Sequence, residues 1–539
     1  MTAKNRARWF AATALVCLMA PSVTYAKAAH KSQIDPRDRR INALEAQVDA
    51  LTKMVTEMRD ERAALPPPPP PHAYVAPAPS PLAVPAQAVA SAGLGPNAGG
   101  VTILAGKPSI QSGDGRFVAN LHGVMQFDAA NYFQSAPGPI GSDLRRGGAS
   151  TDTAHARDLS SGTNFRRARI GIDGKVFGDI DYNILFEFGG AGAEDAGHIQ
   201  ELWLQYSGIK PFRFKVGAFP PSIGLEDQGS TNGSLFLERP AISDIARSVA
   251  GGDFREGAQL SASGQRWLAS VALTTRVVGT INSTGSSNAQ PFDQSFGGIA
   301  RVAFLPVVGD DYMIHVGAHA SRVFAVSDAG GPDVVANRYP VQLRERPELR
   351  VDGTRLIDTG QINASHVTTG GVELAMQKQQ FFVQGEYERI SIDRRASALA
   401  NPNFSGWYVE GGWVLTGERR KYNSTNFAFD APTIDHPFDP ANGTFGAFEL
   451  ALRYSTLDLN YREGTAGLAP LADSVRGGEQ KIISGGLNWY LNSVVRFMFD
   501  YQHVDIDRLS PNAVTFQTPA GAQIGQKYDV IAVRSQLAF

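Results

Sequence analysis

VIAVRSQLAF, residues 530–539, ends the chain and shows the pattern that decides its fold. Apart from Ser535, every second residue is apolar, namely Ile531, Val533, Leu537 and Phe539. Arg534 and Gln536 fall on the opposite face. Because side chains alternate between the two faces of a β-strand, this period of two predicts a strand with one apolar face and one polar face.

The same alternation recurs from about Phe117 to the C-terminus, as in IDYNILFEF (180–188) and VVRFMFDYQ (494–502). A strand needs ~9–11 residues to cross a bilayer at a tilt. We predict sixteen such strands: 117–132, 165–178, 180–189, 198–208, 211–219, 254–264, 266–276, 295–307, 312–324, 366–379, 381–394, 404–418, 447–460, 480–492, 494–506 and 528–539.

The connections between these strands alternate in length. Short turns lie at 178–179, 208–210, 264–265 and 492–493, and long loops lie at 133–164, 220–253, 325–365 and 461–479. An even number of strands with short turns at one end is typical of an outer-membrane barrel. The sequence therefore predicts an all-β fold, a 16-stranded antiparallel transmembrane β-barrel over residues 111–539. A soluble β-sandwich would also alternate, but its long loops would not gather at one end.

One connection departs from this rule. Residues 419–446 fall at the short-turn end but form a long segment. We expect this segment to fold into the end of the barrel.

The N-terminus reads as a signal peptide over residues 1–26. Lys4, Arg6 and Arg8 precede an apolar stretch, and Thr24–Ala26 offers a cleavage site. The only cysteine, Cys17, lies in this segment, so a lipoprotein anchor is the alternative. The mature chain would enter an oxidising compartment without disulfides.

Residues 34–65 form a third kind of pattern. Apolar residues alternate in steps of three and four: Ile41, Leu44, Val48, Leu51, Val55 and Met58. This stripe predicts a coiled coil, with a single amphipathic helix as the alternative. Residues 66–110, which begin with six prolines, predict a semi-rigid linker rich in Pro, Ala and Gly.

Composition excludes several functions. The formal net charge of -2 gives no indication of nucleic-acid binding. The ten histidines show no HExxH spacing, and G-x-S-x-G is absent from the sequence. We therefore predict no catalytic residues, no cofactor and no metal, and we interpret the chain as a non-enzyme.

A wide barrel encloses a water-filled lumen, so a pore is the first functional interpretation. If the terminal phenylalanine faces lipid, parity places nine basic residues inside: Arg167, Arg169, Arg213, Lys215, Arg255, Arg301, Arg453, Arg496 and Arg534. Guanidinium groups bind phosphate or carboxylate bidentately, which favours anion passage. The alternative is that these cations pair with carboxylates of the same lumen.

Two long loops are expected to fold inward and narrow the pore. The constriction loop, 220–253, contains no lysine and carries Glu226, Asp227, Glu238, Arg239, Asp244 and Arg247 among its charged residues. The second inward loop, 325–365, is more basic and carries Arg344, Arg346, Arg350 and Arg355.

Several stretches resemble the phosphate-selective porin family of the outer membrane. They include NFRRARIGIDGKVFGDIDYNILFEFGG, FKVGAFPPSIGLED, FREGAQL, RPELRVDGTRLIDTG, WYVEGGWVLTGERRKY and GGLNWYLNSVVRFMFDY, in the family's order. The resemblance implies a homotrimer of sixteen-stranded barrels with inward-folded loops and arginines along an anion path. Family members use lysines at the constriction, and this chain has none in that loop.

These observations predict a channel for passive diffusion of phosphate-like or other small anions, embedded in outer-membrane lipid. The alternative is a general diffusion porin that tethers the envelope. In that case the coiled coil at 34–65 would contact peptidoglycan or another periplasmic partner.

Overall fold

The computed structural model describes residue 53 and residues 100–104, 106–134, 159–190, 197–250, 254–278, 293–328, 338–511 and 520–539. The chain divides into two compact units, Met1–Val89 and Ala90–Phe539. The signal peptide, the coiled coil and most of the linker therefore lie outside the described residues, apart from Lys53, which is helical. The following description concerns the second unit.

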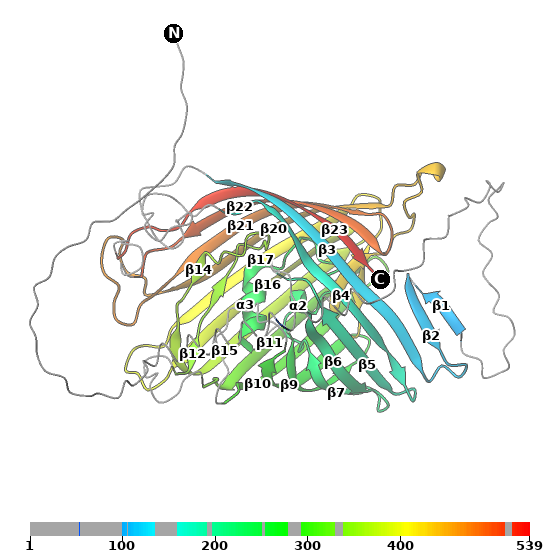
Figure 1. The fold of residues 1–539 in the computed structure, drawn as a ribbon, viewed down its shortest axis with the longest axis horizontal. Helices are drawn as coiled ribbons and strands as arrows, with labels where there is room; N and C mark the ends of the chain where they lie inside the picture. Colours follow the sequence, from blue (N-terminus) through cyan, green and yellow to red (C-terminus); the bar gives the residue numbers. More distant parts are fainter. Residues whose placement is uncertain are drawn as a thin grey trace, which may run out of the picture. The chain divides into compact units, whose positions relative to one another are not determined.

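Sixteen antiparallel strands of the described residues form one closed barrel (Figure 1). They are β3 (Val118–Gln134), β4 (Gly162–Val176), β5 (Ile180–Glu187), β6 (His198–Tyr206), β7 (Phe212–Phe219), β8 (Arg255–Ser263), β9 (Trp267–Val277), β10 (Phe296–Val308), β11 (Tyr312–Ala325), β15 (Ile362–Lys378), β16 (Phe381–Arg394), β17 (Asn403–Val414), β20 (Ala447–Tyr461), β21 (Val475–Tyr490), β22 (Val495–Asp507) and β23 (Lys527–Ala538). Each coincides with a predicted strand within a few residues, so the predicted architecture is confirmed.

The seam joins the last strand to the first. In β23, Ile531 pairs with Asn131 of β3 and Arg534 pairs with Asp128, in antiparallel register. The carbonyl oxygen of Phe539 accepts a hydrogen bond from the backbone N–H of Gly123 at 3.0 Å. This closure leaves no free edge among the sixteen barrel strands.

Shorter elements lie outside the sixteen-strand wall or within the loops. They are β1 (Gly100–Leu104), β2 (Lys107–Gln111), α2 (Leu225–Gln228), α3 (Ala241–Ala250), β12 (Pro340–Val341), β13 (Arg344–Glu345), β14 (Ile357–Asp358), β18 (Arg420–Asn423), β19 (Ala428–Pro432) and η2 (Pro440–Asn442). The hairpin of β1 and β2 extends the sheet at β3.

The two ends of the barrel differ. The short-turn end carries compact connections such as 177–179, 309–311 and 379–380, and the long-loop end carries connections such as 220–254 and 326–361.

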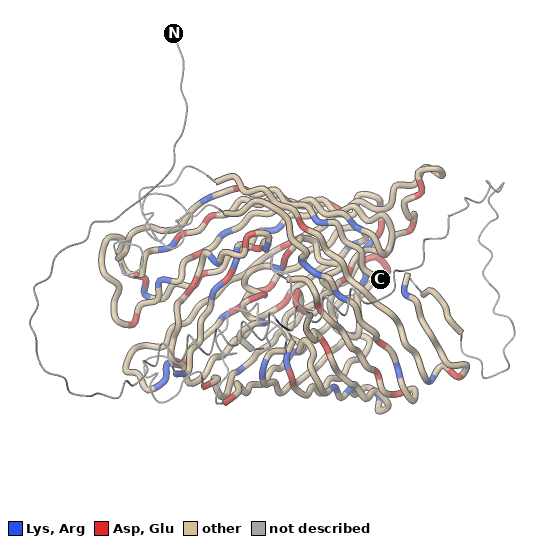
Figure 2. Tube along the Cα trace, viewed as in Figure 1, with Lys and Arg blue, Asp and Glu red and all other residues tan. Residues whose placement is uncertain are grey.

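Charged residues recur along the strands and the enclosed loops (Figure 2). The alternation therefore separates a polar interior from an apolar exterior.

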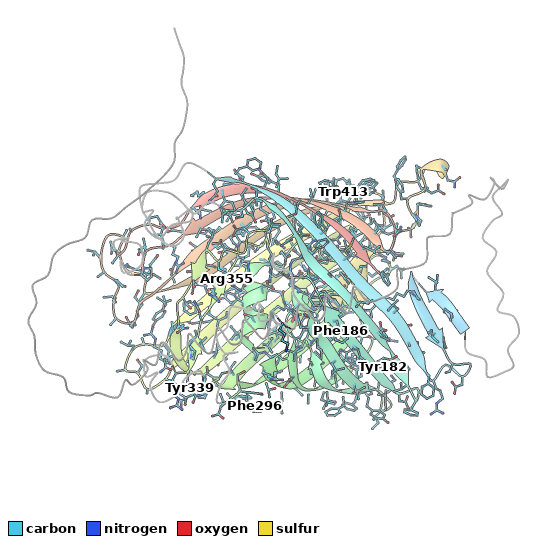
Figure 3. All side chains as sticks on the ribbon, in the orientation of Figure 1. Tyr182, Phe186, Phe296, Tyr339, Arg355 and Trp413 are labelled. Atoms are coloured by element: carbon cyan, nitrogen blue, oxygen red, sulfur yellow. The ribbon has the colours of Figure 1, made fainter. Side chains whose placement is uncertain are left out.

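The outer face is apolar along much of the wall. Apolar side chains on this face are 39–57% exposed, for example Phe186, Leu204, Phe212, Val372 and Ile531. Figure 3 shows Phe296 and Trp413 at the outer margin of the barrel, where lipid would meet them. No helix within the described residues is long and apolar enough to cross a membrane.

The interior is partly filled by α3, which lies inside the barrel (Figure 1). Pro240 precedes this helix, a position where proline's missing N–H costs nothing. Ile242, Ile245 and Val249 recur at helical spacing and pack with apolar side chains of the wall and the second inward loop. Inward-facing wall residues that join this cluster are Ile390, Ile392, Phe404, Leu457, Ile482, Val504 and Val530. The lumen wall is thus apolar where α3 docks.

The long connection at the short-turn end enters the barrel, as predicted. Its strands β18 and β19 form a hairpin, Arg420–Pro432, which we call the plug hairpin. Phe427 of this hairpin is fully buried against Leu268, Ala303 and Leu305 of the wall. Burying an aromatic ring of this kind contributes about 1.5–3 kcal/mol, which favours the inserted position of the hairpin.

Candidate functional site

The constriction loop crosses the interior and is anchored at its tip. Arg496 of β22 donates to the carbonyl oxygens of Asn232 and Ser234, at 3.2 and 2.8 Å. Gln536 of β23 donates to the same Asn232 carbonyl at 2.9 Å. Buried backbone carbonyl groups need hydrogen-bond donors, which water would otherwise supply. Because the wall side chains supply them here, they hold the tip of the loop in place.

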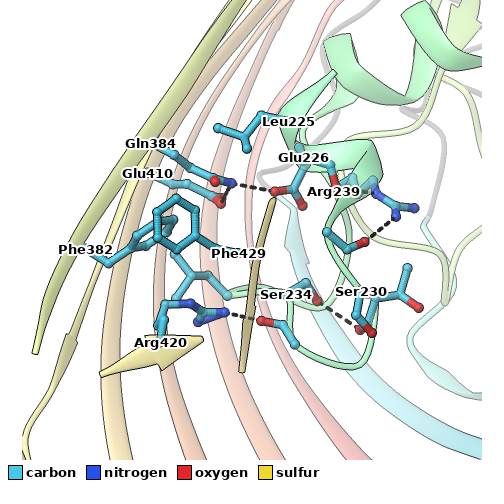
Figure 4. Close-up of a pocket in the computed structure, with 14 residues that line it drawn as sticks. Leu225, Glu226, Ser230, Ser234, Arg239, Phe382, Gln384, Glu410, Arg420 and Phe429 are labelled. Atoms are coloured by element: carbon cyan, nitrogen blue, oxygen red, sulfur yellow. Dashed lines mark hydrogen bonds between the residues drawn. The ribbon is translucent and has the colours of Figure 1, made fainter. Parts of the chain in front are cut away.

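The plug hairpin meets the same tip from the short-turn end. Arg420 donates to the carbonyl oxygen of Gly233 and forms an ion pair with Glu449 of β20 at 3.0 Å. Figure 4 shows this contact region, where Gln384 bridges Glu226 of the loop and Glu410 of the wall. The two inserted segments therefore support each other inside the barrel.

Two acidic residues of the constriction loop are surrounded by arginines. Glu238 contacts Arg166 at 2.6 Å, Arg534 at 3.0 Å and Arg350 at 3.4 Å. Burial opposes its ionisation, but the arginines hold the pKa of Glu238 well below its usual range. Burial likewise opposes the ionisation of Asp244, and Arg350 and nearby arginines lower its pKa to about 2.

The remaining predicted residues of this loop are also engaged. Asp227 pairs with Arg247 at 2.6 Å, and Arg239 donates to the carbonyl oxygen of Glu226 at 3.3 Å. Burial, followed by the neighbouring Glu410, raises the pKa of Glu226 well above its usual range. The loop is therefore packed into place by its charges and presents few of them to water.

Of the nine predicted lumen cations, five lie beneath the inserted segments. They are 1–2% exposed: Arg255, Arg301, Arg453, Arg496 and Arg534. Arg301 binds Glu373 through two hydrogen bonds of 2.8 Å and also donates to the carbonyl oxygen of Phe427 in the plug hairpin. Bidentate pairs of this kind are geometrically specific.

The same arrangement recurs at the seam and at the second inward loop. Arg534 binds Asp128 through two hydrogen bonds of 2.6 Å and donates to the carbonyl oxygen of Leu237. Arg453 pairs with Glu348 at 2.6 Å. These arginines connect the wall to the loops.

The other four predicted cations lie on β4 and β7. Arg167 is buried and donates to Gln126 at 2.6 Å, and Arg169 pairs with Glu187 at 2.5 Å. Arg213 and Lys215 are half-buried. The ammonium nitrogen of Lys215 lies 4.2 Å from the ring centroid of Trp203, without a carboxylate within 4 Å among the described residues.

The second inward loop places its arginines close together above α3. Arg350 pairs with Asp244 at 2.6 Å, whereas the guanidinium group of Arg346 donates to the carbonyl oxygen of Gly353 at 3.1 Å. The backbone N–H of Arg346 donates to Glu345 at 2.8 Å. The Nη1 atom of Arg346 is buried without a hydrogen-bond partner among the described residues. Burial, Arg350 and Arg355 lower the pKa of Arg346 to about 9. The remaining member, Arg344, is half-buried in β13.

The inward-facing residues predicted from alternation along the strands did not include several residues that lie in the interior. Between Gln126 and Phe127 of β3 the register shifts, so one extra residue stands in β4. This bulge places both Arg166 and Arg167 inside, where strict alternation allows only one. Asp128, Glu348, Glu373 and Arg420 were also missed, although the inward parity of the strand residues Asp128 and Glu373 could have found them.

Comparison with known proteins places this architecture in a family. The model of the family described as phosphate-selective porin O and P matches residues 145–538. Porin O of Pseudomonas aeruginosa is 25% identical over 366 residues, which cover 65% of this chain and 78% of that protein. An uncharacterized protein of Caulobacter vibrioides is 26% identical over 360 residues, 66% of this chain and 65% of that protein.

Among solved structures, a loop-deletion mutant of OmpT, an outer-membrane protein of Vibrio cholerae, aligns with a TM-score of 0.44. It is 9% identical, and the alignment covers 79% of this chain and all of that one. The family match extends from the first long loop to the closing strand. The chain therefore belongs to the phosphate-selective porin O and P family and is an outer-membrane porin.

Proposed function

We propose that this porin is an anion-preferring channel for the passive diffusion of phosphate-like or other small anionic solutes. The observation that carries the proposal is Arg346, a buried guanidinium group with a free N–H and, among the described residues, no carboxylate within 4 Å. An arginine in this state gains from any anion that reaches it, because a buried unpaired cation is costly.

The surroundings of Arg346 support the same preference for anions. Arg344, Arg350 and Arg355 lie on the same loop, and Arg166 lies close enough to affect the pKa of Arg346. Within this group, Arg166 and Arg350 share Glu238 and Asp244. Glu345 lies beside Arg346 and Arg350, and Asp358 lies close enough to affect the pKa of Arg355. The five arginines thus face four carboxylates, and the small excess of positive charge favours small anions in the lumen.

Because the cations beneath the inserted segments are covered, we infer that the water-filled path runs beside β4–β7. The inward side chains of Lys175, Asp173 and Asp181 on this wall are 40%, 36% and 24% exposed. With Arg213 and Lys215 they provide both signs of charge. Anion preference would therefore be set at the arginine cluster above this path, and the path itself would be only moderately selective.

The test is the reversal potential of single channels in a potassium chloride gradient. The parent channel should prefer chloride, and Arg346→Gln should lower the chloride-to-potassium permeability ratio at least about twofold, since it removes one positive charge from the arginine cluster. Arg389→Gln, an exposed arginine on the outer face of β16, is the matched control and should leave the ratio unchanged. A cation-preferring parent channel would overturn the proposal.

The solute itself is addressed by competition. Added phosphate should reduce the chloride current more strongly than an equal concentration of sulfate if phosphate-like anions are preferred. Equal block by both anions would leave the channel as a general anion porin and remove phosphate from the proposal.

We also propose that the porin assembles as a homotrimer, as the resemblance to its family implies. Chemical cross-linking of the detergent-purified protein, followed by denaturing electrophoresis, should give a largest cross-linked species of three chains. A largest cross-linked species of one or two chains would contradict this assembly.

A further inference from the structure

A buried cluster of histidine and glutamate side chains lies in the wall beneath the constriction loop. We call it the His319 cluster: His315 and His319 on β11, Glu373 on β15, and Glu386 and Glu388 on β16. None of the five side chains is more than 5% exposed. Neither the arginine cluster nor the path beside β4–β7 includes these residues.

The ligand atoms of this cluster converge. One ring nitrogen of His319 and one carboxylate oxygen from each of Glu373 and Glu386 lie within 4.8 Å of one another. Nδ1 of His319 is 3.0 Å from an oxygen of Glu373, and Nε2 is hydrogen-bonded to Glu388. Both ring nitrogens therefore face carboxylate oxygens.

That geometry places a proton or another cation between the imidazole ring and the carboxylates. A neutral imidazole carries one N–H, so one of its nitrogens would point a lone pair at a carboxylate. Arg301 is the arginine that binds Glu373, and it leaves the charges of Glu386 and Glu388 to be balanced. The Oε2 atom of Glu388 is buried without a hydrogen-bond partner among the described residues. Uncompensated carboxylates are costly at this depth.

The backbone makes room for each carboxylate. A Cβ on Gly371 would stand 2.5 Å from the carboxyl group of Glu388, and one on Gly317 would stand 2.6 Å from Oε2 of Glu373. A Cβ on Gly224, at the start of α2, would stand 2.8 Å from Oε1 of Glu386. Glycine at these positions lets the three side chains reach a common point.

We propose that His319, Glu373 and Glu386 bind a divalent transition-metal ion, for which Zn²⁺ is the representative probe, with Glu388 completing the site. Imidazole nitrogen combined with carboxylate oxygen is a donor set that Zn²⁺ accepts, at bond lengths of ~2.0–2.2 Å. The ligand atoms would draw closer than they stand now. The sequence had predicted no metal, because these ligands come from three strands and show no recognised spacing.

The arrangement around His319 suits a metal ligand. A ligating histidine usually donates its other ring N–H to a carboxylate, which fixes the tautomer. If Nδ1 of His319 binds the ion beside Glu373, the Nε2–H group donates to Glu388, which completes the site in this way. Binding would displace the proton that otherwise bridges the histidine and the carboxylates, so the ion replaces a proton with a larger positive charge.

A metal at this point would connect the wall to both inserted segments. Glu386 accepts the backbone N–H groups of Leu225 and Glu226, at 2.5 and 3.1 Å, at the start of α2. His315 shares a hydrogen bond of 2.9 Å with Tyr422 of the plug hairpin. The unfolded chain lacks this constellation, so the ion would stabilise the folded barrel by mass action.

The experiment uses the full chain purified in detergent and dialysed against EDTA. Titration with zinc chloride, followed by calorimetry and by elemental analysis after removal of free ion, should give one Zn²⁺ per chain. His319→Gln and Glu386→Gln should each weaken binding at least tenfold. His503→Gln, which changes an exposed histidine beside Asp529, is the matched control and should bind as the parent does.

A second readout protects against variants that fail to fold. The EDTA-treated parent should unfold at a lower temperature than the zinc-loaded parent, and Glu388→Gln, which keeps a hydrogen-bonding group beside His319, should reduce that shift. The proposal is overturned if the parent retains less than a tenth of a Zn²⁺ per chain, or if His319→Gln binds as tightly as the parent. Neither outcome depends on channel selectivity, so failure here leaves the proposed function intact.

Discussion

A single guanidinium group, that of Arg534, joins three parts of the barrel. It binds Asp128 across the seam, Glu238 of the constriction loop and the carbonyl oxygen of Leu237. All of these charged side chains are at most 5% exposed. At this depth a pair is costly to break, because the remaining charge stays buried.

Arg534→Met should therefore destabilise the barrel by about 3–5 kcal/mol, the usual cost of removing one partner of a buried ion pair. Unfolding in guanidinium chloride would measure the change. Lys527→Met is the matched control, because Lys527 lies on β23 like Arg534 and pairs with Asp505 of the neighbouring β22, but its side chain is 68% exposed. We expect that control to change stability little. Equal losses in the two variants would contradict the structural role of Arg534.

Glu345 offers a residue-scale prediction of pH dependence. Burial, followed by the charge of Asp244, raises its pKa to about 7, against the effect of Arg350 and Arg346. Below pH 7 the carboxyl group is neutral and the arginine cluster gains one net positive charge. Because the folded pKa is raised, the neutral form predominates on the acidic side and is lost as the pH rises through about 7.

Anion preference should therefore be stronger at pH 6 than at pH 8, measured as the reversal potential in a chloride gradient. Glu345→Gln should keep the pH 6 value at both pH values. A preference that changes with pH to the same extent in this variant would assign the titration to another group.

At the scale of elements, two inserted segments define the interior. The constriction loop docks its α3 helix on an apolar part of the wall, and Glu348 of the second inward loop accepts the N–H of Ala241 at the helix start, at 2.9 Å. This contact satisfies one of the N–H groups that a helix leaves unpaired. The plug hairpin supports the tip of the constriction loop from the opposite end.

Replacing residues 418–445 with a four-residue turn should raise the single-channel conductance. The change removes buried side chains of the plug hairpin from the barrel and withdraws Arg420 from Gly233. Planar-bilayer recording measures the effect. Shortening 395–402, an exposed loop at the other end, is the control and should leave conductance near the parent value. An unchanged conductance in the first variant would place the narrowest point elsewhere.

At the scale of the whole molecule, the alternative function, an envelope tether, would belong to the N-terminal segment and not to the barrel. Apart from Lys53, the predicted coiled coil at 34–65 lies outside the described residues, and the described barrel unit begins its first strand at Gly100. A helix of this length would reach about 45 Å at 1.5 Å per residue. Such a segment could contact the cell wall while the barrel conducts.

Deleting residues 27–99 tests this division. The conductance of the variant in planar bilayers should equal that of the full chain, while cells that carry it should lose envelope integrity, measured as leakage of periplasmic protein. Loss of conductance would instead show that the segment is needed to build or hold the pore. Intact envelopes would contradict the tether hypothesis.

The sequence by itself determined the strands, their closure and the lipid-facing side, because period-two alternation and turn residues act within a few positions of the chain. Only the tertiary structure decided which interior cations remain accessible. Arg301 and Arg534 are covered by segments distant in sequence, and a one-residue bulge brings Arg166 inside. The packing of loops within the lumen depends on contacts between segments that are distant in sequence. Alternation along one strand cannot predict such contacts.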